Sequence, residues 1–69
     1  MIEFKLKDSA QVDLCDLLKI TGIMQTGAEA KHLIATGVVK VDGQIETRKR
    51  AKIRTGQMVE YLHHKIKVI

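Results

Sequence analysis

The residues of this chain with the clearest chemical potential are five cations that lie close together, without an acidic residue among them. They fall between Thr47 and Arg54, hereafter the basic segment, and are Arg48, Lys49, Arg50, Lys52 and Arg54. The whole chain has 12 basic and 8 acidic residues, a net charge of +4, so this segment supplies the entire positive excess. Clustered cations attract polyanions and release counterions on binding, and the planar arginine fork suits phosphate oxygens. The segment therefore predicts a surface that binds a polyanion.

The remaining polar residues offer little for catalysis. Ser9 is the only serine, and Cys15 lies on the apolar stripe of a predicted helix, where a buried structural thiol is the simplest interpretation. His63 and His64 lack the paired ligand spacing of a zinc site, so we interpret them as a solvated turn. No glycine-rich phosphate loop is present. We therefore expect no enzyme, no metal or other cofactor, and no small-molecule substrate.

The length and composition set the size of the protein that carries this surface. The chain has 69 residues, 45% of them apolar, which predicts one domain over 1–69 with a small core of aliphatic side chains. Its single cysteine excludes an internal disulfide and fits a reducing compartment. No apolar run approaches the roughly 20 residues of a membrane span. We expect a cytoplasmic monomer that does not bind membranes.

The hydrophobic pattern places the basic segment among short strands that follow two helices. Strict alternation over 2–7 predicts a strand, and apolar residues at three- and four-residue steps predict helices over 12–20 and 27–36. The second helix begins with a capping box, in which Thr26 accepts from the amide of Glu29 and the Glu29 carboxylate accepts from the amide of Thr26. Asp42-Gly43 predicts a β-hairpin turn, and two further strands follow at 58–62 and 65–69. The fold class is α+β: an N-terminal strand and a two-helix hairpin packed on a small, mostly antiparallel sheet of short strands.

Several polyanions fit such a surface to different degrees. A stacking platform for single strands needs exposed Phe, Tyr or Trp, and the chain has only Phe4 and Tyr61. A helix-turn-helix reader of DNA needs long polar side chains at the start of its second helix, where this chain has Gly27, Ala28 and Glu29. Folded RNA, recognised by shape and phosphate contacts, fits better. The alternative from another class is a protein-interaction module that docks on an acidic partner.

One long stretch also resembles a known family. The sequence "GIMQTGAEAKHLIATGVVKVDGQIE", residues 22–46, resembles the core of the alpha-L RNA-binding domain named for ribosomal protein S-four. The matching features are two glycines that end helices, a Thr-capped second helix with an apolar pair, and a valine-rich strand that runs into Asp-Gly. The resemblance covers about 12–62, and "CDLLK", "TGAEAK" and "VDGQIETRKR" look most like the small stand-alone bacterial members, the YbcJ-like group. It implies a non-catalytic protein that binds structured RNA, such as ribosomal or transfer RNA.

The chain departs from this family at two positions that often contact RNA. Many members open the first helix with Arg-Leu-Asp, where this chain has Asp13-Leu14-Cys15, and many have an arginine where this chain has Gly27. The resemblance therefore carries over only Thr26 and Lys31. We infer that the binding energy has moved to the basic segment, and we expect this segment to lie beside the N-terminal end of the second helix.

The expected RNA contacts follow from the alternation of a strand. If 48–54 is extended, Arg48, Arg50, Lys52 and Arg54 share one face, whereas Ile53 points to the core. An irregular loop at 47–50 would add Lys49 to the exposed set. The predicted RNA-binding residues are Thr26, Lys31, Lys40, Arg48, Lys49, Arg50, Lys52 and Arg54.

Overall fold

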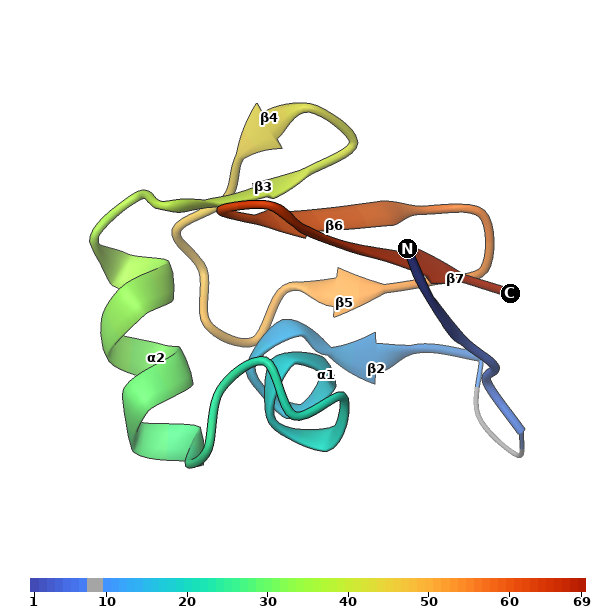
Figure 1. Ribbon diagram of the computed structural model, residues 1–69, viewed down its shortest axis with the longest axis horizontal. Coiled ribbons are helices and arrows are strands. Elements are labelled where there is room, and N and C mark those ends of the chain that lie inside the picture. Colours follow the sequence, from blue (N-terminus) through green and yellow to red (C-terminus); the bar gives the residue numbers. More distant parts are fainter. Residues whose placement is uncertain (8–9) are drawn as a thin grey trace.

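The computed structural model describes residues 1–7 and 10–69, and it shows two layers (Figure 1). A five-stranded sheet forms one layer, two helices form the other, and a two-stranded ribbon lies between the sheet and the first helix (Figure 1). The predicted α+β class, with a helical hairpin on a small sheet, is confirmed.

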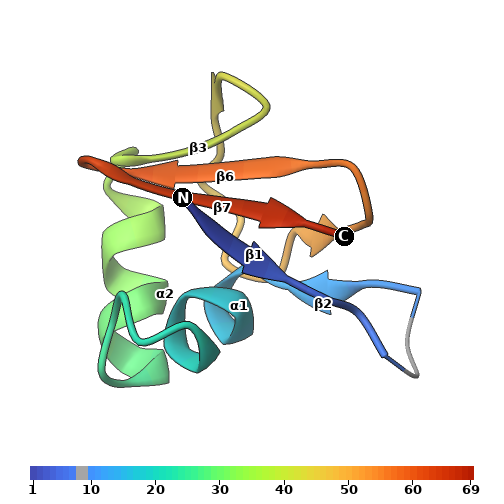
Figure 2. The same cartoon turned by 45° about the vertical axis from the view of Figure 1, so that its right-hand side comes forward.

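The larger sheet is antiparallel except at one edge. Its order is β1-β7-β6-β3-β4, and only β1 and β7 run parallel. Figure 2 shows β1 alongside β7 before the chain crosses to the ribbon. Asp42 and Gly43, at the turn between β3 and β4, have φ values of 52° and 83°, which confirms the predicted hairpin turn. The bounds are β1 Ile2–Phe4, β3 Val39–Val41, β4 Gln44–Ile45, β6 Met58–Tyr61 and β7 His64–Val68.

The two helices are α1, Leu14–Ile20, and α2, Gly27–Ala35. Both predicted helices are confirmed, but the first starts two residues later than expected. Val12–Asp13 instead form β2, which pairs antiparallel with β5, Lys52–Ile53, in the two-stranded ribbon. The basic segment is therefore joined to the start of α1 by strand pairing.

The core lies between the sheet and the helices. The stripe of α1 is fully buried at three leucines, and it meets the side chains of α2 and of the inner sheet face. Cys15 is a buried free thiol, as expected. The most buried side chains are Leu14, Leu17, Leu18, Met24, Ala30, Ile34, Val39, Ile53, Val59, Ile66 and Val68.

The predicted capping box at the start of α2 is half correct. The Thr26 hydroxyl oxygen accepts a hydrogen bond of 3.1 Å from the Glu29 amide. The Glu29 carboxylate accepts from the amide of Gln25, at 2.8 Å, and the predicted return bond to Thr26 is therefore wrong by one residue. Both bonds still satisfy amides at the start of α2, where the backbone N–H groups have no hydrogen-bond partner within the helix.

The glycines at the start and at the exit of α2 are expected to respond in opposite directions to alanine. Gly37 has a φ of +84°, so Gly37→Ala forces an L side chain into the left-handed region and should cost about 1–2 kcal/mol of unfolding free energy. Gly27 lies at the start of α2, and an added Cβ there would meet no atom within 4 Å, so Gly27→Ala should stabilise by about 0.5 kcal/mol. Urea unfolding of both variants tests this, and equal losses at the two positions would contradict it.

Candidate functional site

The backbone of the basic segment is a turn followed by a two-residue strand. The Ala51 amide donates to the Arg48 carbonyl at 3.1 Å, which closes the turn. The first amides of α1 donate to the same turn: Leu14 to the Ala51 carbonyl at 2.9 Å, and Cys15 to the Lys49 carbonyl at 3.0 Å. Asp13, at the N-cap of α1, makes no capping bond with its side chain, so the turn's carbonyls take that place. Main-chain bonds therefore fix the turn without using its side chains.

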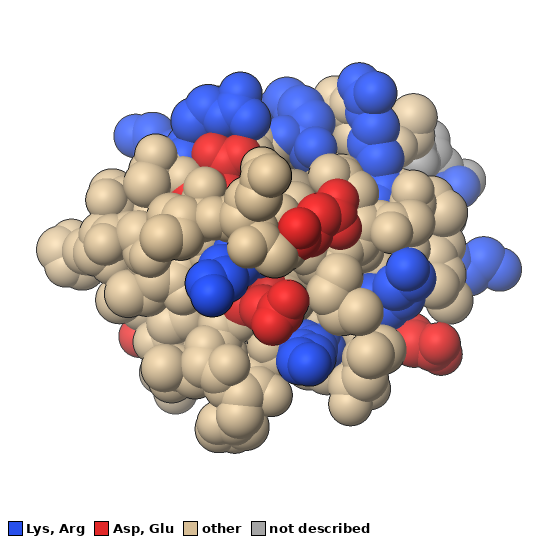
Figure 3. Space-filling view, turned by 90° about the horizontal axis from the view of Figure 1, so that it is seen from above, with Lys and Arg blue, Asp and Glu red and all other residues tan. Residues whose placement is uncertain are grey.

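An open groove of about 590 Å³ lies along this turn. It is lined by Ala35, in the last turn of α2, and by the six consecutive residues 47–52. The four cations among these six are exposed, whereas Ala51 is buried. Figure 3 shows a row of Lys and Arg side chains along its upper margin, whereas blue and red are interspersed over the sheet face in the centre of the view. We call this hollow the basic groove.

Two of the groove's four cations already have carboxylate partners. Arg48 donates through Nε to Glu46 Oε2 at 3.0 Å and through Nη2 to Glu46 Oε1 at 2.9 Å, in a two-pronged pair. Lys52 pairs with Asp13 across the β2–β5 ribbon. In the part of the chain that the structure describes, Lys49 and Arg50 have no such partner. Of the groove's four cations, these two are therefore the most available to an incoming anion.

Arg54 lies outside the groove lining. Its Nε and Nη2 donate to Gln11 Oε1 at 3.3 and 3.2 Å, which ties it to the chain before β2. Ile53 is 1% exposed and points to the core, as the alternation predicts. The irregular loop at 47–50 brings Lys49 into the groove with Arg48 and Arg50, so the exposed cations are not limited to the even positions.

The basic segment was expected beside the N-terminal end of α2, and this expectation is wrong. The groove lies beside the C-terminal turn of the helix, at Ala35, because the chain from β4 passes that end on its way to β5 (Figure 1). Thr26 lies at the opposite end of α2, where its oxygen caps the helix. Lys31 is half-buried and lies one turn before Ala35 on the same flank, since residues four apart share a helix face.

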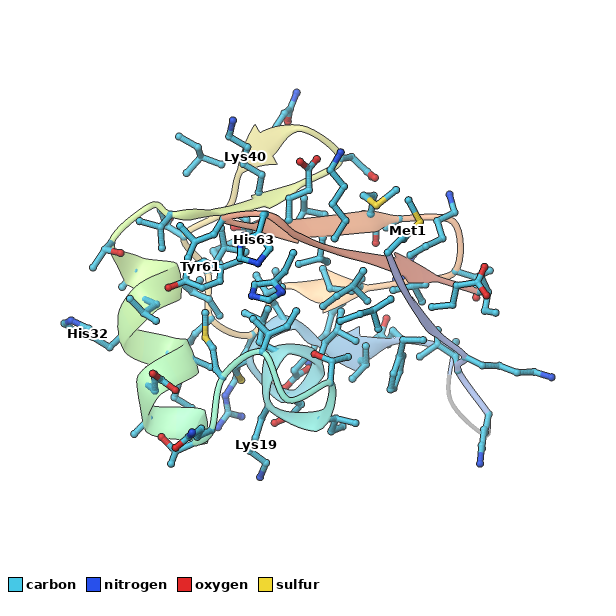
Figure 4. The ribbon with its side chains drawn as sticks, viewed as in Figure 1. Met1, Lys19, His32, Lys40, Tyr61 and His63 are labelled. Atoms are coloured by element: carbon cyan, nitrogen blue, oxygen red, sulfur yellow. The ribbon has the colours of Figure 1, made fainter. Side chains whose placement is uncertain are left out.

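Lys40 is not part of the groove either. It is exposed on the outer face of the sheet, and its Cα partners are Ile45 on β4 and Glu60 on β6. Figure 4 shows its side chain pointing away from the helices. The structure thus brings together Arg48, Lys49, Arg50 and Lys52, and it leaves Thr26, Lys40 and Arg54 outside.

Sequence reasoning misses two residues that matter to the groove: Ala35, which lines it, and Glu46, which pairs with one of its cations. Ala35 lines it without any charge that could mark it in the sequence, and only the path of the chain past α2 reveals its place. Glu46 stands two positions before Arg48, a spacing that could have marked it as the partner that neutralises this arginine. Its side chain is 18% exposed, against 79% for Arg48.

The ion pair between Glu46 and Arg48 shifts the pKa of both side chains. Hydrogen bonds from the Arg48 side chain and amide lower the pKa of Glu46 to about 2, and Glu46 in turn raises the pKa of Arg48. A carboxylate with a lowered pKa in the folded state stabilises the fold above its unfolded pKa and loses this contribution as the pH falls through the folded value. The contribution of Glu46 should therefore disappear between about pH 4.5 and pH 2.

Comparison with Glu46→Gln isolates this contribution. The wild type should be more stable than the variant at neutral pH, and the difference in unfolding midpoint should shrink as the pH falls from about 4.5 to about 2. The other carboxylates titrate in both proteins and cancel in the difference. A difference that stays constant over this range would show that the pair does not stabilise the fold.

The described residues, 1–7 and 10–69, contain no group of three or more side chains placed to hold a metal ion. Neither of the two helices in these residues is long and apolar enough to cross a membrane. The class is therefore argued from the fold and from the basic groove, which four cations line.

The fold and the groove define a small α+β domain of the alpha-L type, in which cations gather beside a helical hairpin. Residues 4–69 match the S4 domain family, and the chain belongs to that family. It is 51% identical to YbcJ of Escherichia coli (strain K12), whose provisional name describes an RNA-binding protein, over 100% of this chain and 99% of that one. YbcJ of Shigella flexneri matches with the same identity and coverage.

A solved structure agrees with this assignment. The solution structure of YbcJ from E. coli superposes with a TM-score of 0.77 at 51% identity, covering 100% of this chain and 87% of that one. It is described as revealing an alpha-L motif involved in RNA binding. The resemblance to the alpha-L domain and to the YbcJ-like group is therefore confirmed.

Proposed function

We propose that this protein binds RNA, and that it recognises structured RNA through the basic groove without catalysing a reaction. The observation that carries the proposal is a pair of exposed cations, Lys49 and Arg50, held on a turn that α1 fixes by its backbone. The S4 family assignment and the description of YbcJ's alpha-L motif support RNA as the ligand. Contacts to phosphate give affinity and position, which is the mode that a cationic groove without aromatic lining residues can supply.

Structured RNA suits the groove better than duplex DNA does. The start of α2 presents Gly27, Ala28 and Glu29, which have no basic reach into a major groove, and it lies at the far end of the helix from the cations. Folded RNA is recognised largely by shape and by phosphate and ribose contacts. We propose ribosomal or transfer RNA as the target and a cytoplasmic monomer as the binding species.

Titration at several salt concentrations tests the proposal. An RNA hairpin and a DNA duplex of equal length are compared, and we expect tighter binding to the RNA. The logarithm of the RNA affinity should fall linearly with the logarithm of the salt concentration, with a slope of roughly −2 to −4 for three to five phosphate contacts. Equal affinities for RNA and DNA, or an affinity that barely changes with salt, would overturn the proposal.

An acidic protein is the other class of partner that the groove fits. Affinity capture from cell extract with and without ribonuclease distinguishes the two, because partners held through RNA are lost on digestion. Proteins retained after digestion, and released by the same groove substitutions, would favour an acidic protein partner over RNA.

A further inference from the structure

The hairpin tip between β6 and β7 gathers three ring side chains. Tyr61 ends β6 and His64 begins β7; they are Cα partners, and their rings lie 6.5 Å apart at an interplanar angle of 7°. The ring of His63 lies 4.3 Å from that of His64 at 34°. His63 is exposed, whereas Tyr61 and His64 are half-buried. The three rings thus lie next to one another in the order Tyr61, His64, His63, and the last of them is exposed.

The fourth residue of the tip, Leu62, has an unusual conformation. Its φ is 55°, a left-handed value that hairpin turns normally assign to glycine, asparagine or aspartate. The residue is also 74% exposed, so burial does not offset the backbone strain. Strained residues cluster at functional sites, ligand-binding sites among them. Leu62 and His63 together present apolar and ring surface at the tip.

The tip and the basic groove adjoin the same end of α2. Tyr61 pairs with Val39, which follows Ala35 of the groove by four residues. In Figure 4, Tyr61 and His63 point from the sheet toward the side that the helices cover. The molecule measures only 28 × 22 × 18 Å, so a folded RNA in the groove is within reach of the tip. The tip sequence, residues 61–65, has no acidic residue to repel it.

We propose that the β6–β7 tip is a second contact that stacks on one unpaired base of the RNA held in the groove. This inference rests on the proposed function and adds a preference to it. Bases within an RNA helix are stacked on one another and are not available to side chains, whereas bases in bulges and loops are. Ring stacking is tolerant of base identity, because every base has a π-face. The groove would supply affinity, and the tip would select RNA with an unpaired base.

Two RNA probes test this directly: a blunt duplex, and the same duplex with a single bulged adenosine. The wild type should bind the bulged duplex about 5- to 150-fold more tightly, the range expected for one base–aromatic stack. His63→Ala should abolish this preference and leave the affinity for the blunt duplex unchanged. A fluorescent 2-aminopurine at the bulge should be quenched by the wild type and not by the variant.

Three further variants separate stacking from charge. His63→Phe keeps a ring and should retain the preference, whereas His63→Lys supplies a cation without a ring and should lose it. His32→Ala removes an exposed histidine from α2 and should change nothing, since its side chain points away from the molecule (Figure 4). A preference that survives His63→Ala, or that His63→Lys retains, would overturn the stacking site.

The failure of this inference is distinct from that of the proposed function. If the wild type binds both duplexes equally, with a normal salt dependence, the tip is not a base-binding site and the groove proposal stands. If neither duplex shows salt-dependent binding, the groove proposal itself is overturned, and the tip proposal falls with it.

Discussion

Replacing Lys49 and Arg50 with alanine is expected to reduce the affinity for structured RNA by roughly 100-fold, and the salt slope by roughly two units. These are the groove cations without a carboxylate partner in the described part of the chain, so an incoming phosphate displaces no ion pair to reach them. Charge-assisted hydrogen bonds contribute about 1.5 kcal/mol each at the lower end, and two of them correspond to roughly this loss. Each phosphate contact removed lowers the salt slope by about one unit.

The fold of this double variant should be preserved. The Lys49 residue supports α1 through its carbonyl, which accepts from Cys15, and alanine keeps that carbonyl. Both side chains are exposed, and exposed charges contribute little to stability. Unfolding free energies within about 0.5 kcal/mol of wild type would confirm this.

The matched control is Lys5→Ala/Lys7→Ala. It removes the same two charges from exposed positions that line a different hollow, one that shares no residue with the basic groove. We expect its RNA affinity to fall only slightly, through the lower net charge. Equal losses in the two double variants would mean that overall charge, and not the groove, binds RNA.

The elements that could be predicted are those with their own periodicity. Leu14, Leu17 and Leu18 repeat at helical spacing and are fully buried, and Asp42-Gly43 has the φ values that its turn requires. The β2–β5 ribbon could not be predicted, because two-residue strands carry no repeat and arise from pairing between distant segments. That pairing is also what delays the start of α1.

The charge of the site was readable from the sequence, but the availability of each cation was not. The partner of Lys52 is Asp13, 39 positions away, and the partner of Arg54 is Gln11, 43 positions away. Such pairs depend on the ribbon that brings the two segments together. The groove lies at Ala35 and not at Thr26. The sequence could not predict this, because it does not show which end of α2 the basic segment passes.

Ala35 offers the second test with a large expected effect. It is exposed, and among the described residues that line the groove it alone lies outside 47–52. Ala35→Glu would place a carboxylate among Arg48, Lys49 and Arg50, where it both pairs with a cation and repels phosphate. We expect at least about a 100-fold loss of RNA affinity, since two phosphate contacts at about 1.5 kcal/mol each would be affected together. Filter binding or fluorescence anisotropy at constant salt measures it.

Ala35→Glu also lowers the stability of α2, so its control variant must lower that stability by a similar amount. An acidic residue in the last turn of α2 opposes the helix dipole, at about 0.3–1 kcal/mol. His32→Glu carries the same kind of cost, because His32 also lies in the last turn, and it adds the same charge at a position whose side chain points away from the molecule (Figure 4). If His32→Glu weakens RNA binding as much as Ala35→Glu does, the effect is not local to the groove.

Substitution with a residue of the opposite charge distinguishes a local effect on the groove from misfolding, because misfolding cannot improve binding. Ala35→Lys adds a cation to the same wall of the groove and favours the helix dipole at that end of α2. We expect it to tighten RNA binding by up to about 10-fold and to steepen the salt slope by about one unit, as one added phosphate contact would. Opposite shifts from glutamate and lysine at one alanine would place the RNA phosphates against the C-terminal turn of α2. Shifts in the same direction would mean that Ala35 faces something other than a polyanion.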